Sequence, residues 1–249
     1  MRPGLIRLAL LVLLVMLLEA LCWLGVIDRL TMQPPHQMAV NMVQMLVSGR
    51  LNDAILKTLA NSAVACVSAI VVGVASGFVL HRLRTVRATL DPLFATYYAV
   101  PVFAFYPLMI ILFGLGDVPE IVIGFMLAVI AVIVSVLNGL DHVPRVLLKT
   151  ARVYGFGVWE TAWRVTLPYV APYVLTAAKL ALAYALIGVI GAEFIMSTSG
   201  MGYEISFAYT NFDNATMYPL ILLIILVSVG VNAALARWER ALMTRRGLS

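Results

Sequence analysis

The chain has 249 residues, of which 63% are hydrophobic and 12% charged, and its mean hydropathy is +1.00. Soluble domains average roughly 45–50% apolar and about 25% charged residues, and one domain of this length cannot bury so large an apolar fraction. The composition excludes a soluble enzyme, a disordered chain and a disulfide-stabilised secreted module, and it predicts an integral membrane protein.

The basic character of the chain does not indicate a nucleic-acid partner. The formal net charge is +5, but the basic residues fall between apolar runs and form no continuous stripe. The two cysteines, Cys22 and Cys66, each lie in an apolar stretch. They predict core-facing or lipid-facing thiols and no disulfide framework.

Six apolar runs are long enough to cross a bilayer core, which needs roughly 20 helical residues. None shows the polar and apolar alternation of a barrel strand. The first run is too long for a signal peptide and lacks a small-residue cleavage site, so we expect it to remain as a span. The six runs cover about residues 5–27, 56–80, 92–115, 121–140, 169–196 and 217–235.

The basic residues predict the orientation of these spans. Thirteen of the 17 lysines and arginines lie at the termini or in the loops on the same side of the membrane as the termini. The opposite side holds Arg29, Arg50 and Lys57, and Lys179 lies inside the fifth run. Because positive charge collects on the cytoplasmic side, both termini are expected to be cytoplasmic.

The loop at about residues 141–168 is the longest on the predicted cytoplasmic side and is expected to have structure of its own. Its sequence indicates a short helix ending at Gly155, a second amphipathic helix over about 156–164, and Pro168 at the start of the fifth span. The second helix carries Trp159 and Trp163. These tryptophans indicate either a partner surface or the lipid interface, and the spacing does not decide between them.

This loop resembles the EAA loop of ABC-importer permeases, whose pattern is E-A-A, three residues, Gly, nine residues, then I-x-L-P. Ala151 matches the second alanine, Gly155 the glycine, and Leu167-Pro168 the closing pair. The departures are Lys149 for glutamate, Thr150 for the first alanine and Val165 for isoleucine.

Two further stretches are similar to the nitrate/sulfonate/taurine group of these permeases. Pro101, Pro107, Phe113-Gly114 and Gly116 resemble its P…PL…WFG-G stretch, with Val102 in place of a second proline. Ala192-Glu193 and the run from Ser199 to Tyr203 resemble its A-E…SGLGY stretch. Three motifs in order are far more specific than one, and the resemblance covers about residues 56–235.

The resemblance implies an all-α polytopic membrane protein with six transmembrane helices and the type I ABC-importer permease fold. It divides the chain into an N-terminal span with an extracytoplasmic loop (1–53), a permease core (54–236) and a basic cytoplasmic tail (237–249). The coupling loop is implied to contact the ATPase through Lys149, Thr150, Ala151, Gly155, Val158, Trp159, Glu160, Trp163, Leu167 and Pro168.

The resemblance implies an assembly in which two permeases lie in a bacterial inner membrane, two ATPases bind on the cytoplasmic side, and a solute-binding protein binds on the extracytoplasmic side. The permease itself is not expected to be an enzyme or to hold a cofactor. None of the three lysines follows a glycine, so the chain cannot form a P-loop, and ATP must bind a partner chain. The lipid bilayer is the remaining expected partner.

The substrate implied by the resemblance is a small organic or inorganic anion, such as a sulfonate, taurine, nitrate or an aromatic carboxylate. The alternative is a neutral vitamin or pyrimidine precursor. Less favoured are a self-sufficient secondary transporter, for which no inverted repeat is visible, and a membrane-embedded transferase, for which no cluster of His, Asp or Glu converges.

Polar and proline residues inside the spans are candidates for the substrate pathway or a gate. Lys179 and Glu193 are 14 residues apart, roughly 21 Å along one helix face; snorkelling of the lysine and a local backbone cap by the glutamate are the alternatives. Glu19 and Asn61 indicate interhelical contacts. The third span is expected to be one kinked, pore-lining helix; its candidates are Tyr98, Pro101, Phe105 and Pro107.

Gly73 and Gly77 form a G-x-x-x-G pair in the second span. Such spacing permits close helix crossing, either within the protomer or between two copies.

Overall fold

The computed structural model describes residues 3–28 and 31–245, and every regular element in these ranges is helical. Arg2, Arg29 and Arg246, which entered the orientation argument, lie outside the described residues, as does the end of the predicted tail. The α-helices are α1 (Pro3–Trp23), α2 (Pro35–Val47), α3 (Asn52–Arg82), α4 (Arg84–Thr96), α5 (Tyr106–Phe113), α6 (Asp117–Asp141), α7 (Arg145–Val153), α8 (Val158–Thr161), α9 (Leu167–Met196), α10 (Met201–Thr210) and α11 (Asn214–Arg245). Two 3₁₀ segments, η1 (Tyr97–Ala99) and η2 (Val102–Phe105), lie between α4 and α5, and the π-helical segment η3 (Ala162–Thr166) joins α8 to α9.

The all-helical prediction is confirmed. Among the described residues, five helices are long and apolar enough to cross a membrane, or six if one bent pair is a single span. That pair corrects the third predicted span, which is not one kinked helix. Arg84–Ala99 and Val102–Phe113 meet at 89°. Pro101 causes the break because the residue before a proline avoids the helical region, and Val100 is extended at ψ 123°. Pro107 lies in the first turn of α5, where no amide donor is needed.

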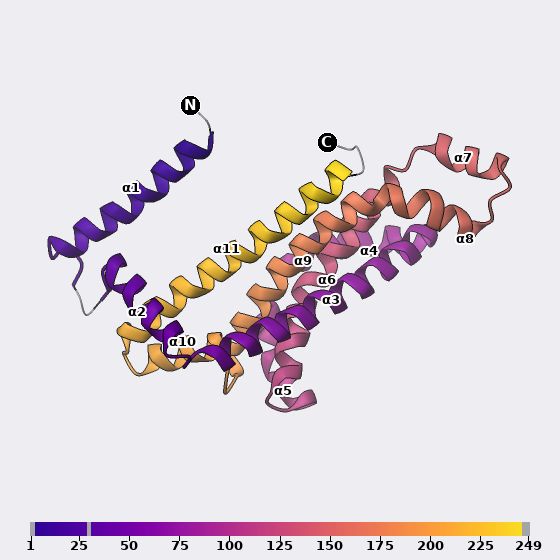
Figure 1. The fold of residues 1–249 in the computed structure, drawn as a ribbon. Helices are drawn as coiled ribbons and strands as arrows, with labels where there is room; N and C mark the ends of the chain where they lie inside the picture. Colours follow the sequence, from indigo (N-terminus) through magenta and orange to yellow (C-terminus); the bar gives the residue numbers. More distant parts are fainter. Residues whose placement is uncertain (1–2, 29–30, 246–249) are drawn as a thin grey trace.

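Helices α3, α6 and α9 lie side by side and form the core (Figure 1). Small residues line their contacts, which lets the backbones approach closely, as in many membrane helix bundles. A Cβ placed on Gly188 of α9 would lie 2.6 Å from Cα of Gly124 on α6. The fully buried alanines of this core are Ala65, Ala69, Ala128, Ala177, Ala181 and Ala185.

The G-x-x-x-G pair on α3 packs against α6 of the same chain. A Cβ on Gly73 would lie 2.6 Å from Cβ of Val132, and one on Gly77 would lie 2.7 Å from Cγ1 of Val136. The close crossing that the sequence predicts is therefore a contact within the protomer.

Replacing both glycines by alanine should destabilise the protein, because overpacking a filled contact typically costs about 1–3 kcal/mol per site. Gly230 of α11 is the matched control, because a Cβ there would meet no atom within 4 Å. Thermal unfolding in detergent should show a lower midpoint for Gly73→Ala/Gly77→Ala and an unchanged or higher midpoint for Gly230→Ala. Equal midpoints for wild type and the double variant would contradict the packing.

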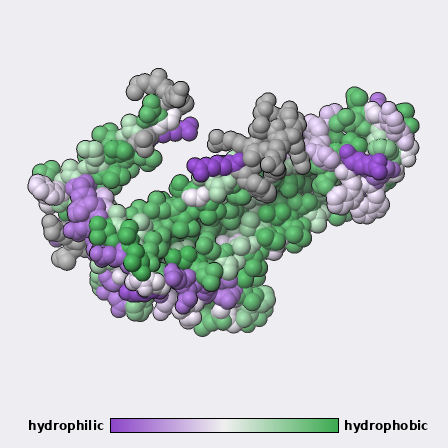
Figure 2. Space-filling view, viewed as in Figure 1, coloured by the Kyte–Doolittle hydropathy of each residue, from purple (hydrophilic) through white to green (hydrophobic). Residues whose placement is uncertain are grey.

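The surface is apolar over the middle of the bundle and hydrophilic toward both ends (Figure 2). Helix α1 stands apart from the bundle and adjoins α2 (Figure 1). Glu19 of α1 bonds His36 of α2 through both the backbone amide (3.1 Å) and ring Nδ1 (2.5 Å) of the histidine. The interhelical contact expected of Glu19 is therefore present. Both cysteines are free and buried.

Candidate functional site

Lys57, near the start of α3, is the centre of a polar network at one end of the bundle. Its Nζ lies 3.1 Å from Oδ1 of Asp117 and 3.2 Å from Oε1 of Glu120, both on α6. It also bonds Oγ of Ser199 at 2.8 Å and Oγ of Ser197 at 3.2 Å. These serines lie between α9 and α10, so one ammonium group joins three parts of the fold.

Glu120 is completely buried in this network. A buried carboxylate is costly unless it is paired and hydrogen-bonded. Besides the ammonium of Lys57, it accepts a bond of 2.9 Å from the Asn61 side-chain amide. Asn61 also donates to Asp117 at 3.3 Å. Asn61 thus forms the interhelical contact that the sequence indicates, and it joins α3 to α6.

Glu193 of α9 is also completely buried and holds the start of α10. The hydroxyl of Thr58 lies 2.8 Å from each carboxylate oxygen, and the backbone amide of Gly202 donates to Oε2 at 2.9 Å. The amide of Met201 donates to the Thr58 hydroxyl at 2.9 Å, so the hydroxyl hydrogen is left for the glutamate. The carboxylate therefore accepts bonds at the positive end of α10.

Two glycines of the SGMGY stretch make this contact possible. Gly200 has a φ of +104°, and a Cβ there would lie 2.4 Å from Cδ of Glu193. A Cβ on Gly202 would lie 2.3 Å from the carbonyl oxygen of Ile190 and 2.7 Å from Cβ of Glu193. The glycines let the α9–α10 turn wrap closely around the glutamate. We name Lys57, Thr58, Asn61, Asp117, Glu120 and Glu193 the polar network.

Sequence reasoning missed most of this network, because it counted Lys57 only as a loop charge and did not single out Asp117 or Glu120. A usable signal was present. Lys57 begins the second span and the two acids begin the fourth, so all three are predicted at the same membrane face. Unlike charges at the ends of adjacent spans indicate an ion pair.

The opposite end carries the segment from α7 to η3 (residues 145–166), which we name the α7–α8 segment. Gly155 ends α7 as predicted, with a φ of +75°. The amide of Phe156 bonds the carbonyl of Ala151, and the amide of Gly155 bonds the carbonyl of Arg152, both at 3.0 Å. This is the Schellman pattern of helix termination, which needs a left-handed residue at Gly155.

The second part of the segment differs from the prediction. A separate amphipathic helix was expected over about 156–164, with a new helix starting at Pro168. Instead α8, η3 and α9 form one helical stretch, Val158–Met196. Pro168 lies inside this stretch, directly after η3, and the π-helical turn of η3 accommodates the amide donor that the proline lacks.

The tip of the segment exposes apolar side chains. Val153 is 86% and Tyr154 75% exposed. Ala151 is buried, and Glu160 forms an ion pair with Arg164 at 3.2 Å. The other residues assigned to the coupling loop are half-buried or exposed, and they are Lys149, Thr150, Val158, Trp159, Trp163, Leu167 and Pro168.

The pathway candidates do not form one cluster. Tyr98 is half exposed and stacks on Tyr184 of α9, with ring centroids 5.7 Å apart. Both line a cavity of about 580 Å³ between α4, α6 and α9. Phe105 and Pro107 lie beyond the break, in η2 and α5, and Lys179 is half-buried on α9. Pro101 lies at the break and Glu193 in the polar network.

A sequence model of the binding-protein-dependent transport system inner membrane component matches residues 69–246. The chain belongs to this family. It is a permease component of an ABC importer. The matched region contains the break at Pro101, the α7–α8 segment and the Glu193 contact.

Curated relatives place the chain near taurine and sulfonate permeases. It is 27% identical over 219 residues to the taurine transport system permease protein TauC of Escherichia coli K12, covering 84% of this chain and 80% of the relative. It is 28% identical over 192 residues to the putative aliphatic sulfonates transport permease protein SsuC of Bacillus subtilis, covering 76% and 70%. It is also 27% identical over 165 residues to the riboflavin transport system permease protein RibX of Chloroflexus aurantiacus, covering 64% and 62%.

Among solved structures, the fold is similar to a chain of the MetNI methionine ABC transporter in an inward-facing conformation. The TM-score is 0.65 at 21% identity, and the match covers 77% of this chain and 95% of that one. The match confirms the type I importer permease fold.

Proposed function

We propose that two copies of this permease form the substrate pathway of an ABC importer and that a separate ATPase drives them through the α7–α8 segment. The observation that carries the proposal is the exposed apolar tip of that segment, which is fixed by the Gly155 turn and directly precedes the helical stretch that contains α9. Val153 and Tyr154 are largely exposed and offer the ATPase an apolar surface, next to Phe156, whose ring lies 6.3 Å from that of Tyr154.

The fold supports transmission from this tip into the bundle. Because α8, η3 and α9 form one helical stretch, a displacement of α8 by an ATPase bound at the neighbouring tip moves α9. Helix α9 packs closely on α6 and α3, and its far end holds the polar network. Transport requires an equilibrium between an inward-open and an outward-open state, and ATP shifts it only by binding the two states with different affinities. ATP must therefore favour the state with closed ATPases and an outward-open pathway.

The orientation follows from charge. The α7–α8 segment carries Arg145, Lys149, Arg152 and Arg164, and its end of the molecule is proposed to face the cytoplasm with both termini. The polar network then lies at the extracytoplasmic end, where a solute-binding protein would deliver its cargo.

The relatives support a small solute as the substrate, but their named substrates differ in chemical class. Taurine and aliphatic sulfonates are named for two relatives and riboflavin for a third. The anion remains our proposal because the two sulfonate-type relatives cover more of the chain. The cavity between α4, α6 and α9, with Tyr98 and Tyr184 in its wall, is the proposed place for the pathway.

Co-purification tests the proposal. The tagged chain is co-expressed with an ABC ATPase and a solute-binding protein from the same genome and purified in nanodiscs. We expect two ATPases for every two permeases, and ATP hydrolysis that the loaded binding protein stimulates. A chain that purifies as a monomer without ATPase would contradict the proposal.

A further inference from the structure

Two adjoining cavities lie where the α7–α8 segment meets the end of α3. The first, of about 350 Å³, is an apolar groove whose wall includes Val74, Phe78, Arg82, Trp159, Ala162 and Trp163. The second, of about 280 Å³, has a mixed wall that includes His81, Arg82, Arg152, Thr161 and Thr166. Phe78, Arg82 and Ala162 belong to both walls.

The charged side chains that line these cavities are basic. Arg82 and Arg152 form no ion pair with any residue that the structure describes, and no carboxylate is among the lining residues of either cavity. The neighbouring acids are engaged elsewhere. Glu160 pairs with Arg164, and Asp141 pairs with Arg87 and lies 3.4 Å from His81 Nδ1. The groove therefore ends in cationic charge that the described residues leave uncompensated.

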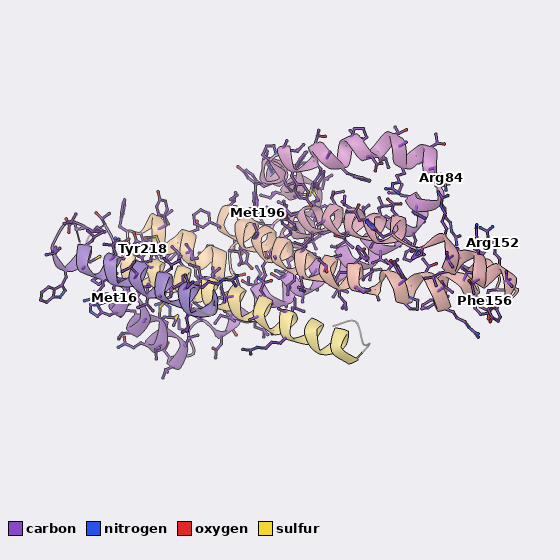
Figure 3. The ribbon with its side chains drawn as sticks, turned by 90° about the horizontal axis from the view of Figure 1, so that it is seen from above. Met16, Arg84, Arg152, Phe156, Met196 and Tyr218 are labelled. Atoms are coloured by element: carbon purple, nitrogen blue, oxygen red, sulfur yellow. The ribbon has the colours of Figure 1, made fainter. Side chains whose placement is uncertain are left out.

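The arrangement follows the membrane direction. From Val74 to Arg82 the groove follows the last part of α3 toward the end of the bundle that carries Arg84, Arg152 and Phe156 in Figure 3 and lies far from Tyr218. An apolar groove that ends beside two arginines fits an amphiphile with a hydrocarbon chain and an anionic phosphate head.

We propose that this place binds an anionic phospholipid of the cytoplasmic leaflet. One acyl chain lies in the apolar groove against Phe78, Trp159 and Trp163, and the head-group phosphate lies between Arg82 and Arg152. The leaflet assignment rests on the orientation proposed above.

The site gives the lipid a role beyond solvation, because its wall joins two separate elements of the fold. Arg82 belongs to α3, whereas Arg152, Thr161 and Trp163 belong to the α7–α8 segment. A lipid that contacts both parts favours the arrangement in which they are adjacent. Trp159 and Trp163 can therefore contact lipid, as one of the two interpretations of their sequence holds, while Val153 and Tyr154 at the exposed tip contact the ATPase.

Brominated lipids test the proposal because bromine quenches nearby tryptophan fluorescence. The chain has four tryptophans, and Trp23→Phe/Trp238→Phe leaves only the two in the groove. The full chain in neutral detergent is titrated with brominated phosphatidylglycerol and, separately, with brominated phosphatidylcholine. Each basic residue near a membrane surface favours an anionic lipid roughly fivefold. With two arginines, we expect half-quenching at a phosphatidylglycerol concentration roughly 25-fold lower than the phosphatidylcholine concentration needed for it.

Arg82→Gln/Arg152→Gln should abolish this preference and leave quenching by phosphatidylcholine unchanged. Arg84→Gln/Arg145→Gln is the matched control. It removes the same amount of charge at the same end of the bundle, but neither residue lines either cavity, so this variant should keep the preference for phosphatidylglycerol. Equal quenching by the two lipids, or an unchanged preference in the first variant, would overturn the site.

Two further measurements separate other occupants. Displacement of the brominated phosphatidylglycerol by millimolar glycerol 3-phosphate would assign the arginines to a soluble phosphate and overturn the lipid. Lipid extracted from the permease–ATPase complex should contain phosphatidylglycerol as the free permease does; its loss would show that the ATPase occupies the groove. Failure of the wild-type chain to bind any ATPase would instead contradict the proposed function and leave the lipid result standing.

Discussion

Gly155→Val is expected to reduce the amount of ATPase that co-purifies with the permease at least tenfold. Gly155 has a φ of +75° and ends α7 through two backbone bonds to Ala151 and Arg152. A β-branched residue in this conformation costs about 1–3 kcal/mol, and tenfold in affinity corresponds to about 1.4 kcal/mol. The strained turn opens, and Val153 and Tyr154 then leave the position proposed for their contact with the ATPase.

Gly157 provides the matched control two residues later. It has an ordinary φ of −65° and a Cβ there would meet no atom within 4 Å, so Gly157→Ala should retain the ATPase. Neither substitution fills occupied space, and both chains should elute as folded protein on gel filtration. Normal ATPase binding by Gly155→Val would show that the conformation of this turn does not support the contact.

The second large effect is expected at the opposite end, where Glu193→Ala should lower the free energy of unfolding by about 3 kcal/mol. The substitution leaves the Thr58 hydroxyl and the Gly202 amide without their acceptor, and hydrogen bonds to a charged group contribute about 1.5–3 kcal/mol each. The thermal midpoint in detergent should fall by several degrees. Glu204→Ala, on the first turn of α10, is the control and should change the midpoint little.

A double-variant cycle identifies the contact behind this loss. Thr58→Val removes the donor, so Thr58→Val/Glu193→Ala should be less destabilised than the sum of the two single variants, as expected for residues that touch. Additive losses would show that the two side chains do not interact, and the account of the polar network would be wrong at this position.

The helical fold and most spans could be predicted because both depend on local composition. A run of about 20 apolar residues specifies a spanning helix wherever it occurs, and Gly155 specifies its turn through its own φ. The break at Pro101 could not be predicted in the same way, because two prolines in one span are compatible with either one kinked helix or two separate helices. The structure decides this at Val100, where the backbone becomes extended.

The polar network could not be predicted by the same reasoning because its partners are far apart in the sequence. Lys57 and Glu120 are 63 residues apart, and Thr58 and Glu193 are 135 apart. Only the packing of α3 against α6 and α9 brings them together. The resemblance to known permeases marked Glu193 and the SGMGY stretch, but it gave no physical reason for the glycines, which is their close approach to the glutamate.

The unbroken helical stretch from Val158 to Met196 has a mechanical consequence. Helix α9 supplies 30 of its residues and is roughly 45 Å long at the rise of an α-helix. If this helix pivots near its middle, its two ends move in opposite directions, and a tilt of about 10° displaces each end by roughly 4 Å. Narrowing at the ATPase side would then widen the far side through lever action alone, with no relay of side-chain rearrangements between them.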